Sequence, residues 1–402
     1  MNIFVINSGS SSIKYQLIEM PSTKVVCTGI VERIGKEDAA IIHKTFKEDK
    51  EQVKRVVMNL SDHEQGLKEV ASLLTDPRIG VIKHPSEIHM VGHRVVHGGE
   101  SFAATTVITK EVKDKIKKLF PLASLHNPPN YLGIEVAEKL FINATQIAVF
   151  DTAFHQTIPE EAFRYAIPSK FYYDFGIRVY GFHGTSHKYV SEKAAEYLHK
   201  KDSKIITIHL GNGCSMTAVK EGKSVDTSMG FGPMNGLIMG TRAGDIDQSV
   251  IFYLVNQLGY EVEKVKEILN YNSGMIGLTG LNDMRDITAK IENGDKQALL
   301  AYHMYAYRIR KYIGAYTAVL NGLDAIVFTG GVGENDRMMR QLCSSNLEYL
   351  GIQLDEETNN RRLKGLHEIN TRESRVKILV IPTNEELEIA TQCYGLLLKA
   401  KG

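Results

Sequence analysis

Cysteine is scarce in this chain. The four cysteines, Cys27, Cys214, Cys343 and Cys393, lie far apart among 402 residues and form no CxxC pair. This spacing excludes a zinc ribbon and a thioredoxin motif, and it offers no disulfide framework. A chain of this length can bury a sizeable core without covalent cross-links. We therefore expect a cytoplasmic protein in a reducing environment.

Long hydrophobic runs and an excess of one charge are also missing. The longest apolar runs, such as 378–381, have strand length, well short of the roughly 18 residues of a spanning helix. The start of the chain, MNIFVINSGSSSIKYQL, lacks the basic residues and cleavage site of a signal peptide. Lysine and arginine number 48 against 47 acidic residues. We expect a soluble protein with neither a nucleic-acid nor a membrane partner.

The remaining composition is that of a globular protein in which strands and helices alternate. Hydrophobic residues make up 43% and charged residues 24% of the chain, and its length suggests two domains or three. Short β-branched runs predict buried strands at 3–6, 147–150, 205–210, 325–328 and 377–381. Amphipathic periodicity predicts helices at 62–75, 110–120, 186–200, 261–269, 295–320 and 385–399. The fold class is therefore α/β.

Two parts of the chain share a strand, turn and strand arrangement. The strand at 3–6 leads into NSGSSS and a second apolar stretch at 13–18. Much later, the strand at 205–210 leads into GNGCS and another stretch at 216–219. We infer a duplicated fold. Small residues at such turns let backbone N–H groups approach a phosphate, although ordinary hairpin turns would have the same composition.

A third glycine cluster, TGGVGEN at 329–335, follows a predicted strand and opens a helix that we expect to begin near Glu334. A strand, a glycine loop and a helix N-terminus together form an anion or nucleotide site. The standard fingerprints are incomplete, because Thr217 replaces the first glycine of a Walker motif and Met216 the last glycine of a dinucleotide motif. If a nucleotide binds, it binds between hairpin turns.

An arginine lies inside a valine-rich strand, VGHRVVHGG at 91–99. Alternation places Arg94 and Val96 on one face, away from His93 and His97. A buried guanidinium needs a carboxylate or phosphate beside it, because leaving it unpaired is costly. Arg94 therefore marks either an anion site or a structural ion pair.

Further candidates follow the predicted strand at 147–150. Asp151 closes this strand, where open α/β sheets place their sites, although it could instead cap the next turn. His183 and His187 are four residues apart, but Gly184 predicts a loop there and not a metal-binding helix. We favour one functional histidine, His183, over a zinc pair.

Two later segments also carry charged residues. The glycine-rich stretch 226–247 contains Arg242 beside carboxylates and is too long for a passive connection, although a solvated surface loop is the alternative. The final helix starts at TNEE, 383–386, where helix capping explains the glutamates unless one of them holds a metal.

Together these segments resemble the acetate kinase family, the acetokinases. The resemblance covers nearly the full length and is specific because the blocks occur in one order. They are NSGSSSIK at 7–14, GHRVVHGG at 92–99, FDTAFHQT at 150–157, GFHGTSH at 181–187, HLGNGCS at 209–215, DTSMGF at 226–231, GTRAGDID at 240–247, FTGGVGEN at 328–335 and TNEEL at 383–387.

The resemblance implies a two-domain, duplicated actin-like ATPase fold, shared with hexokinase, heat-shock ATPases and actin, with the active site in an interdomain cleft. The N-terminal domain would comprise 1–152 plus 383–402 and so recover the last helix. The C-terminal domain, 153–382, would carry most of the nucleotide site. The resemblance also implies a homodimer.

The resemblance also implies roles for particular residues. Asn7 and Glu385 match the magnesium positions, Glu385 less securely because Glu386 is adjacent. The implied catalytic residues are Arg94, Asp151, His183 and Arg242. The substrate-binding residues would be Arg94, for the carboxylate, and Val96, Leu125, Phe182 and Pro233, for the acyl methyl. Nucleotide contacts would come from Lys14, His209, Leu210, Gly211, Asn212, Gly213, Asp283, Met284, Arg285, Gly331, Val332, Gly333, Glu334 and Asn335.

The implied reaction is reversible, magnesium-dependent, in-line transfer of the γ-phosphoryl group of ATP to acetate, with manganese as a possible substitute. Acetate is already an anionic nucleophile, so the reaction needs charge neutralisation more than a strong base. A preference for propionate or another short-chain carboxylate is the alternative, because one methylene is worth only about 1–3 kcal/mol. An actin-like ATPase without kinase activity is a more distant one.

Overall fold

The computed structural model describes residues 1–47 and 50–401. The chain divides into two compact units: unit 1 is 1–153 with 384–402, and unit 2 is 154–383. These limits differ by one residue from the domain limits expected from the sequence. Residues 48, 49 and 402, which belong to the expected first domain, lie outside the described residues.

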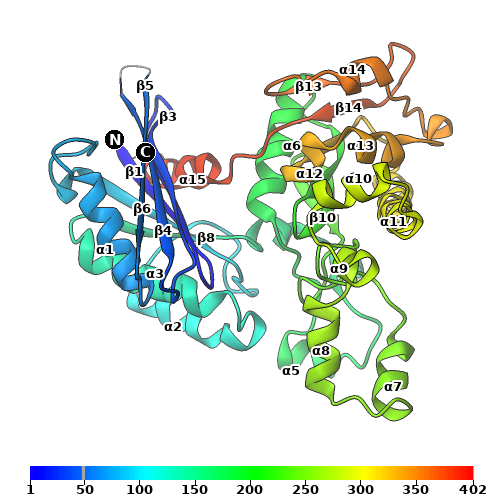
Figure 1. Cartoon of the computed structure of the whole chain (residues 1–402), viewed down its shortest axis with the longest axis horizontal. Coiled ribbons are helices and arrows are strands. Elements are labelled where there is room, and N and C mark those ends of the chain that lie inside the picture. The colour runs from blue at the N-terminus through cyan, green and yellow to red at the C-terminus, as the bar shows by residue number, and fades with distance from the viewer. Residues whose placement is uncertain (48–49, 402) are drawn as a thin grey trace. The chain divides into compact units, whose positions relative to one another are not determined.

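Unit 1 is built on an eight-stranded sheet with the order β5-β4-β3-β2-β1-β6-β8-β7 (Figure 1). Strands β1, β6 and β8 run parallel to one another, and every other neighbouring pair is antiparallel. The strands are β1 (Asn2–Ser8), β2 (Ile13–Glu19), β3 (Lys24–Glu32), β4 (Ala39–Lys47), β5 (Lys50–Met58), β6 (Ile88–Val95), β7 (Thr106–Val107) and β8 (Thr145–Phe150).

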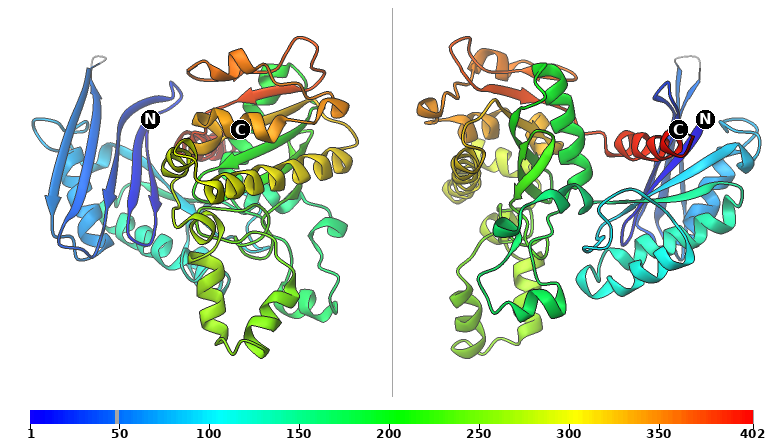
Figure 2. Two further views of the ribbon diagram at one scale, coloured as in Figure 1. Left: turned by 45° about the vertical axis from the view of Figure 1, so that its right-hand side comes forward. Right: turned by 180° about the vertical axis from the view of Figure 1, so that it is seen from behind.

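Helices cover both faces of this sheet around β1 (Figure 2). Phe4 and Ile6 of β1 pack toward α1 and α3, whereas Ile3 and Val5 pack against Ile389 of α15. Burial of alternate residues on both faces explains the continuous apolar run of this strand. The helices of the unit are α1 (His63–Leu74), η1 (Pro85–Glu87), α2 (Lys110–Lys118), η2 (Phe120–Leu122), α3 (Asn127–Leu140) and α15 (Glu385–Lys401).

Unit 2 contains a six-stranded sheet with the order β11-β10-β9-β12-β14-β13. Its strands β9, β12 and β14 are parallel, and β10, β11 and β13 pair antiparallel with their neighbours. The unit 1 series β3-β2-β1-β6-β8-β7 has the same order and directions, so the predicted duplication is confirmed. The strands are β9 (Lys204–Leu210), β10 (Cys214–Lys220), β11 (Lys223–Thr227), β12 (Ala325–Thr329), β13 (His367–Glu368) and β14 (Lys377–Val380).

The sheet of unit 2 also lies between helices. Val190 and Ala194 of α6 pack on Ile205 and Val327, and α11 packs on β9 and β10. The helices are η3 (Ala153–Thr157), which spans the limit between the units, α4 (Glu160–Phe163), α5 (Lys170–Phe175), α6 (Gly184–Leu198), α7 (Gln248–Asn256), α8 (Val262–Tyr271), α9 (Gly274–Thr279), α10 (Met284–Glu292), α11 (Lys296–Leu320), α12 (Gly330–Asn335), α13 (Arg337–Ser344), η4 (Glu348–Leu350) and α14 (Glu356–Asn360).

The strands and helices expected from periodicity are all present, but two local expectations are wrong. The helix expected near Glu334 begins at Gly330, because the glycines themselves form its first turn. The segment at Gly184 is the first turn of α6 and not a loop. Throughout 1–47 and 50–401, the structure has no helix of the length and apolarity needed to cross a membrane.

Candidate active-site residues

Three predicted residues of unit 1 lie where parallel strands end. Asn7 is near the end of β1, Arg94 near the end of β6, and Asp151 directly follows β8. Because β1, β6 and β8 are adjacent, their carboxyl ends bring these side chains together. This is the edge at which open α/β sheets place ligand sites.

Arg94 is the centre of this cluster. Its Nη2 donates to Asp151 Oδ2 at 2.8 Å, and its Nη1 lies 3.5 Å from Asn7 Oδ1. Its Nε is buried, has no hydrogen-bond partner among the described residues, and lies 3.8 Å from Glu385 Oε2. Burial by itself lowers the pKa of Arg94, but the carboxylates of Asp151 and Glu385 raise it above its usual value. The guanidinium is therefore fixed, charged and able to donate further hydrogen bonds.

Glu385 is the first residue of α15, a position that favours an acidic side chain at a helix N-terminus. Burial raises the pKa of Glu385 to about 7, although Arg94 acts in the opposite direction. Lys14, which pairs with Asn7 across β1 and β2, also lowers the pKa of Glu385. The predicted nucleotide residue Lys14 thus lies within electrostatic range of this cluster.

The oxygen donors of unit 1 suit a hard cation. Asn7 offers an amide oxygen and Glu385 a carboxylate, and magnesium commonly takes one or two protein carboxylates with water and phosphate oxygens. Among the described residues, no group of three His, Cys, Asp or Glu side chains is placed to hold a metal. A zinc site of protein side chains alone does not fit, whereas Asn7 and Glu385 fit magnesium with phosphate.

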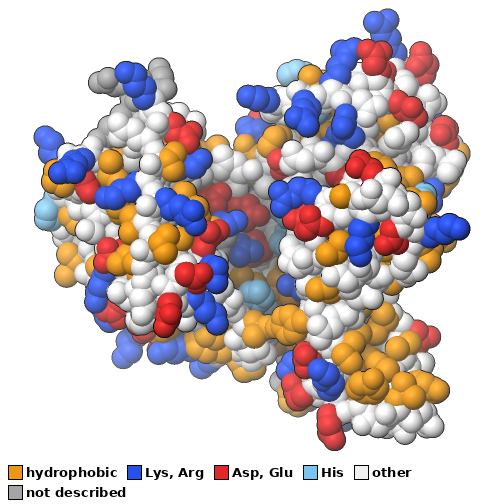
Figure 3. All heavy atoms as spheres, in the orientation of Figure 1, with side chains coloured by type: hydrophobic (Ala, Val, Ile, Leu, Met, Phe, Trp, Pro, Cys, Tyr) orange, Lys and Arg blue, Asp and Glu red, His pale blue; other side chains and the backbone are white. Residues whose placement is uncertain are grey.

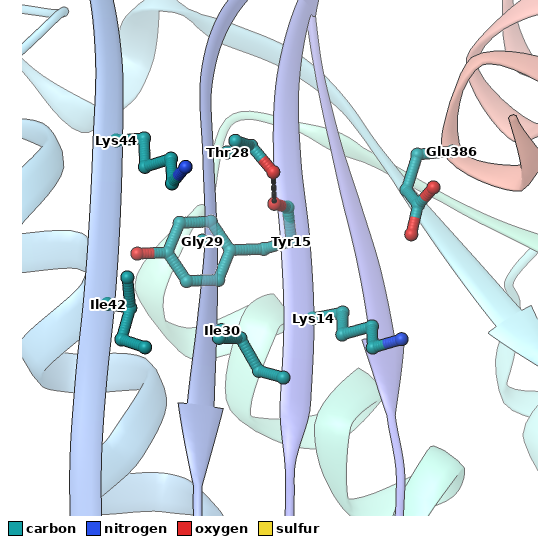
Figure 4. Close-up of a pocket in the computed structure, with 8 residues that line it drawn as sticks. All are labelled: Lys14, Tyr15, Thr28, Gly29, Ile30, Ile42, Lys44 and Glu386. Carbon is teal, nitrogen blue, oxygen red and sulfur yellow. Dashed lines mark hydrogen bonds between the residues drawn. The ribbon is translucent and has the colours of Figure 1, made fainter. Parts of the chain in front are cut away.

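Glu386, the alternative to Glu385, faces a different part of unit 1. It borders a hollow of about 250 Å³ on the sheet surface, together with Lys14 and Lys44 (Figure 4). Ile30 and Ile42 are apolar residues that also line this hollow. Of the two glutamates, only Glu385 has a carboxylate within 4 Å of Arg94.

Two buried asparagines of α3 hold the loop that follows Arg94, and the sequence analysis missed both. Asn130 Oδ1 accepts from the Val96 N–H at 3.0 Å, and its Nδ2 donates to the Ser8 carbonyl at 2.6 Å. Asn127 bonds both the N–H and the carbonyl of His97 at 3.0 Å. The signal was available as the sequence HNPPN, in which prolines start a helix beside two amides. Val96 is thereby fixed, whereas the predicted pocket residue Leu125 is 55% exposed in the preceding turn.

In unit 2, the two predicted phosphate loops meet at one sheet edge. The turn 211–213 joins β9 to β10, and α12 follows β12, the parallel neighbour of β9. Gly330 has a φ of +77°, and a Cβ there would lie 2.7 Å from the Leu210 carbonyl oxygen. Only glycine permits this approach without strain. The predicted residues 209–213 and 331–335 are therefore neighbours.

Glu334 acts within the loop and not as an exposed contact. Its Oε1 accepts from the Gly330 N–H at 3.0 Å and from the Thr383 N–H at 3.2 Å, and burial raises its pKa. Arg340, which the sequence analysis missed, is buried and its Nη1 donates to the carbonyls of Gly333 and Glu334 at 3.0 and 2.8 Å. Both side chains hold the glycine helix in place.

His183 and Arg242 flank the same turn. A Cβ at Gly213 would lie 3.4 Å from the His183 ring and 3.7 Å from Arg242 Nη1. The ring of His183 stacks on that of His209, with centroids 4.5 Å apart. His183 also has a φ of 56°, which is unusual for a residue with a side chain.

Arg242 is mostly buried, and burial lowers its pKa. Its Nη1 donates to the carbonyl of the predicted pocket residue Pro233 at 3.0 Å. Phe182, another predicted pocket residue, is 3% exposed beside His183. The structure therefore brings together His183, His209, Gly213, Arg242 and Pro233.

The predicted residues 283–285 form a separate local feature. Asp283 caps α10 by accepting from the Arg285 N–H at 2.9 Å, and it also pairs with the Arg285 guanidinium at 2.6 Å. These bonds lower the pKa of Asp283 to about 2. The Arg285 side chain is 88% exposed, and no described hydrogen bond connects this turn to the phosphate loops.

The acetokinase family model matches residues 2–391. The chain belongs to the acetokinase family. It is 61% identical to the acetate kinase of Flavobacterium johnsoniae, over 99% of the chain and 100% of that protein. The crystal structure of Porphyromonas gingivalis acetate kinase has a TM-score of 0.92 at 42% identity, covering 98% of this chain and 99% of that one. A propionate kinase from Francisella tularensis has a TM-score of 0.90 at 41% identity, covering 97% and 98%.

Family membership confirms the expected α/β fold, with its two mixed sheets in two units. It also explains why the predicted residues gather at the carboxyl ends of β1, β6 and β8 in one unit and of β9 and β12 in the other.

Proposed function

We propose that this chain is an acetate kinase, which transfers the γ-phosphoryl group of ATP reversibly to acetate. The observation that carries the proposal is the 61% identity to a curated acetate kinase over 99% of the chain. Membership of the acetokinase family implies ATP as a co-substrate. A carboxylate oxygen of acetate forms a bond to γ-phosphorus while the bond to the β-phosphate oxygen breaks, giving acetyl phosphate and ADP.

The main obstacle to this reaction is repulsion between anions, and the positive charges of two arginines would offset this repulsion. Arg94 is held by Asp151 with its Nε still available, and Arg242 is held through Pro233. We assign to them the neutralisation and alignment of the acetate carboxylate and the transferring phosphoryl group.

His183 and Asp151 complete the catalytic set. His183 lies beside Gly213 at the phosphate turn, from where its ring can donate a hydrogen bond to a phosphoryl oxygen. Asp151 accepts from Arg94 and thereby orients the guanidinium. Neither role needs a strong general base, because acetate is ionised at neutral pH.

The nucleotide is assigned to unit 2, with Lys14 as the contribution of unit 1. The backbone of residues 209–213 and of 331–335 would contact the phosphates and the nucleoside, as N–H groups at glycine turns do. We place Asp283, Met284 and Arg285 at the nucleoside end, where the exposed Arg285 can reach a ligand.

Magnesium, or manganese in its place, is assigned to Asn7 and Glu385. Such an ion would supply charge neutralisation at phosphate oxygens. The contribution of the chain is to hold the amide and carboxylate oxygens beside Arg94 at the end of β1 and the start of α15. Glu385 supports this assignment better than Glu386, which borders the sheet-surface hollow.

The acyl group is assigned to the residues implied by the family resemblance, Val96 and Leu125 of unit 1 with Phe182 and Pro233 of unit 2. Val96 and Phe182 are 5% and 3% exposed. A small pocket favours acetate over longer acids by only about 1–3 kcal/mol per methylene. A propionate preference therefore remains the second candidate, favoured by the similarity to the Francisella tularensis propionate kinase.

A hydroxylamine trap tests the function directly. Purified protein, ATP and magnesium are incubated with formate, acetate, propionate, butyrate or no acid, and acyl hydroxamate is quantified. We expect the highest kcat/KM with acetate. A propionate optimum would keep the mechanism and change the substrate, whereas ATP hydrolysis without any hydroxamate would refute the kinase assignment and favour a non-kinase ATPase.

We further propose that the protein is a cytoplasmic homodimer. Exposed apolar side chains gather on α7, α8 and the turn between them, as the orange patch at the lower right of Figure 3 shows. They include Phe252, Tyr253, Leu258 and Val262, which are 55–65% exposed. Sedimentation velocity should give twice the 44.9 kDa chain mass, and Phe252→Asp should give the monomer. A wild-type monomer at micromolar concentration would contradict this assembly.

A further inference from the structure

A buried chain of hydrogen bonds leads from His183 into the core of unit 2. Ser215 Oγ lies 2.8 Å from His183 Nδ1 and 2.7 Å from His187 Nε2. His187 Nδ1 lies 2.7 Å from Thr207 Oγ1, whose hydroxyl lies 3.4 Å from the Thr217 carbonyl oxygen. Ser215, His187 and Thr207 are each 0% exposed. Buried groups of this kind stay paired because losing a partner costs desolvation energy.

The backbone carbonyl at one end sets the direction of every proton in this chain. A carbonyl only accepts, so Thr207 donates its single hydroxyl hydrogen to Thr217 and must accept from His187 Nδ1–H. In neutral His187, Nε2 then has no hydrogen and accepts from the Ser215 hydroxyl. Because the Ser215 hydroxyl donates its only hydrogen to His187 Nε2, its oxygen accepts from His183 Nδ1–H.

We propose that Ser215, His187 and Thr207 are positioning residues that fix the tautomer of His183 with its proton on Nδ1. This inference rests on the proposed role of His183 at the phosphoryl group. In the neutral ring, Nε2 then carries no proton. His183 can donate from Nε2 to a phosphoryl oxygen only as the imidazolium, which also contributes a positive charge.

Polar side chains surround the His183 ring, in addition to the Ser215 hydroxyl at Nδ1. His187 lies on its own helix, His209 stacks on the ring from β9, and Arg242 lies across Gly213. These are basic or neutral groups of unit 2. The Ser215 bond therefore contributes to the orientation of the ring as well as to its tautomer.

Nitrogen NMR of protein labelled with ¹⁵N-histidine reads the tautomer without any turnover. His183→Gln identifies the His183 signals by their loss. We expect an Nδ1-protonated ring in the wild type and a shift toward the Nε2-protonated form in Ser215→Ala, since that form is favoured in free histidine. An Nε2-protonated His183 in the wild type would overturn the proposal.

Kinetics provide the second readout. Ser215→Ala should lower kcat about tenfold or more, because the ring loses the acceptor that orients it and that also bonds Nδ1–H of the imidazolium. The KM values for acetate and ATP should stay within about twofold, since substrate binding does not require that bond. Ser191→Ala is the matched control, since Ser191 is a buried serine of α6 that donates to the Lys188 carbonyl of its own helix. Equal kcat values in the two variants would contradict a positioning role.

Two conservative substitutions of Thr207 distinguish loss of the hydroxyl from misfolding. Thr207→Val removes the hydroxyl but keeps the shape, and Thr207→Ser restores it. We expect Thr207→Val to shift the His183 tautomer and lower kcat, and Thr207→Ser to recover both. Failure of the serine variant to recover either would overturn the relay. A wild-type protein that forms no acyl hydroxamate would refute the proposed function instead, while the tautomer would still be readable.

Discussion

Arg94 and Asp151 form an ion pair between the ends of two neighbouring parallel strands, with 2.8 Å between Nη2 and Oδ2. The Asp151 side chain is 1% exposed and that of Arg94 17%. A pair this buried has little room to reorganise, so it fixes the guanidinium before substrate arrives. Preorganised charge of this kind lowers a transition-state barrier more than flexible surface charge does.

We therefore expect Asp151→Asn to lower kcat about 100-fold, because Arg94 loses the partner that orients it. Glu138→Gln is the matched control in unit 1, since Glu138 accepts from Lys113 at 2.6 Å but is 30% exposed. That change should leave kcat within about twofold, because neither Lys113 nor Glu138 belongs to the proposed site. Coupled-assay kinetics on both folded variants make the comparison, and equal losses would contradict a special role for the buried pair.

Arg242 should not tolerate lysine. Arg242→Lys keeps the charge but loses the planar fork that donates to Pro233 and to the proposed phosphoryl group. We expect a fall in kcat of about 100-fold. Arg361→Lys, at a position 58% exposed, is the control and should retain wild-type kcat. A normal rate in Arg242→Lys would show that the planar guanidinium of Arg242 is not needed to bind the phosphoryl group.

Substitution of the two adjacent glutamates should have different effects on the magnesium concentration that the enzyme needs. In Glu385→Gln we expect the magnesium concentration for half-maximal activity to rise about 10–100-fold. Glu386→Gln, which changes the hollow on the sheet surface, should leave this magnesium concentration unchanged. Magnesium titrations at saturating ATP separate the two, and a larger effect of Glu386→Gln would reverse the assignment. Chelation with EDTA should abolish activity in the wild type.

Val96 should control acyl-chain length. Val96→Ala enlarges the space beside Arg94, so the ratio of kcat/KM for propionate over acetate should rise about tenfold. Val112→Ala shortens another buried valine of unit 1 and should leave the ratio unchanged. An unchanged ratio in Val96→Ala would place the acyl group elsewhere.

Stability should fall in mild acid partly through His43. Burial, aided by Lys54, lowers the pKa of His43 to about 4 in the fold, below the ordinary value of 6.5. Between these pH values the unfolded chain binds the extra proton, so stability is full above about pH 6.5 and falls as the pH decreases toward 4.

His43→Asn removes this titration and keeps a polar group near Tyr15, whose hydroxyl lies 2.8 Å from His43 Nδ1. Urea unfolding at pH 7 and pH 5 should show a smaller pH dependence in this variant, by about 1.4 kcal/mol per pH unit at most. His303→Asn, at an exposed position, should keep the wild-type slope. A wild-type slope in His43→Asn would show that His43 does not contribute to this pH dependence.

Local sequence patterns predicted much of the fold because they depend on short-range physics. The apolar runs at β1, β9 and β12 predict strands buried on both faces. Apolar residues with a 3.6-residue period predict the helices α1, α6 and α11. The sequence placed Gly330 in a loop before a helix, whereas in the structure it starts α12, and this role depends on the neighbouring Leu210 carbonyl. Only the folded chain supplies that neighbour.

The sequence by itself determined the α/β class, the duplicated hairpins and the resemblance that names the candidate residues, because motifs and periodicity lie along the chain. Tertiary structure decided which distant residues meet: Asn130 with Val96, Arg340 with the glycine helix, and Ser215 between His183 and His187. These contacts join residues far apart in sequence, and strand order together with helix packing brings them together. A local pattern can mark one partner, as HNPPN marks Asn130, but not the contact itself, because a hydrogen bond depends on where both partners lie in space.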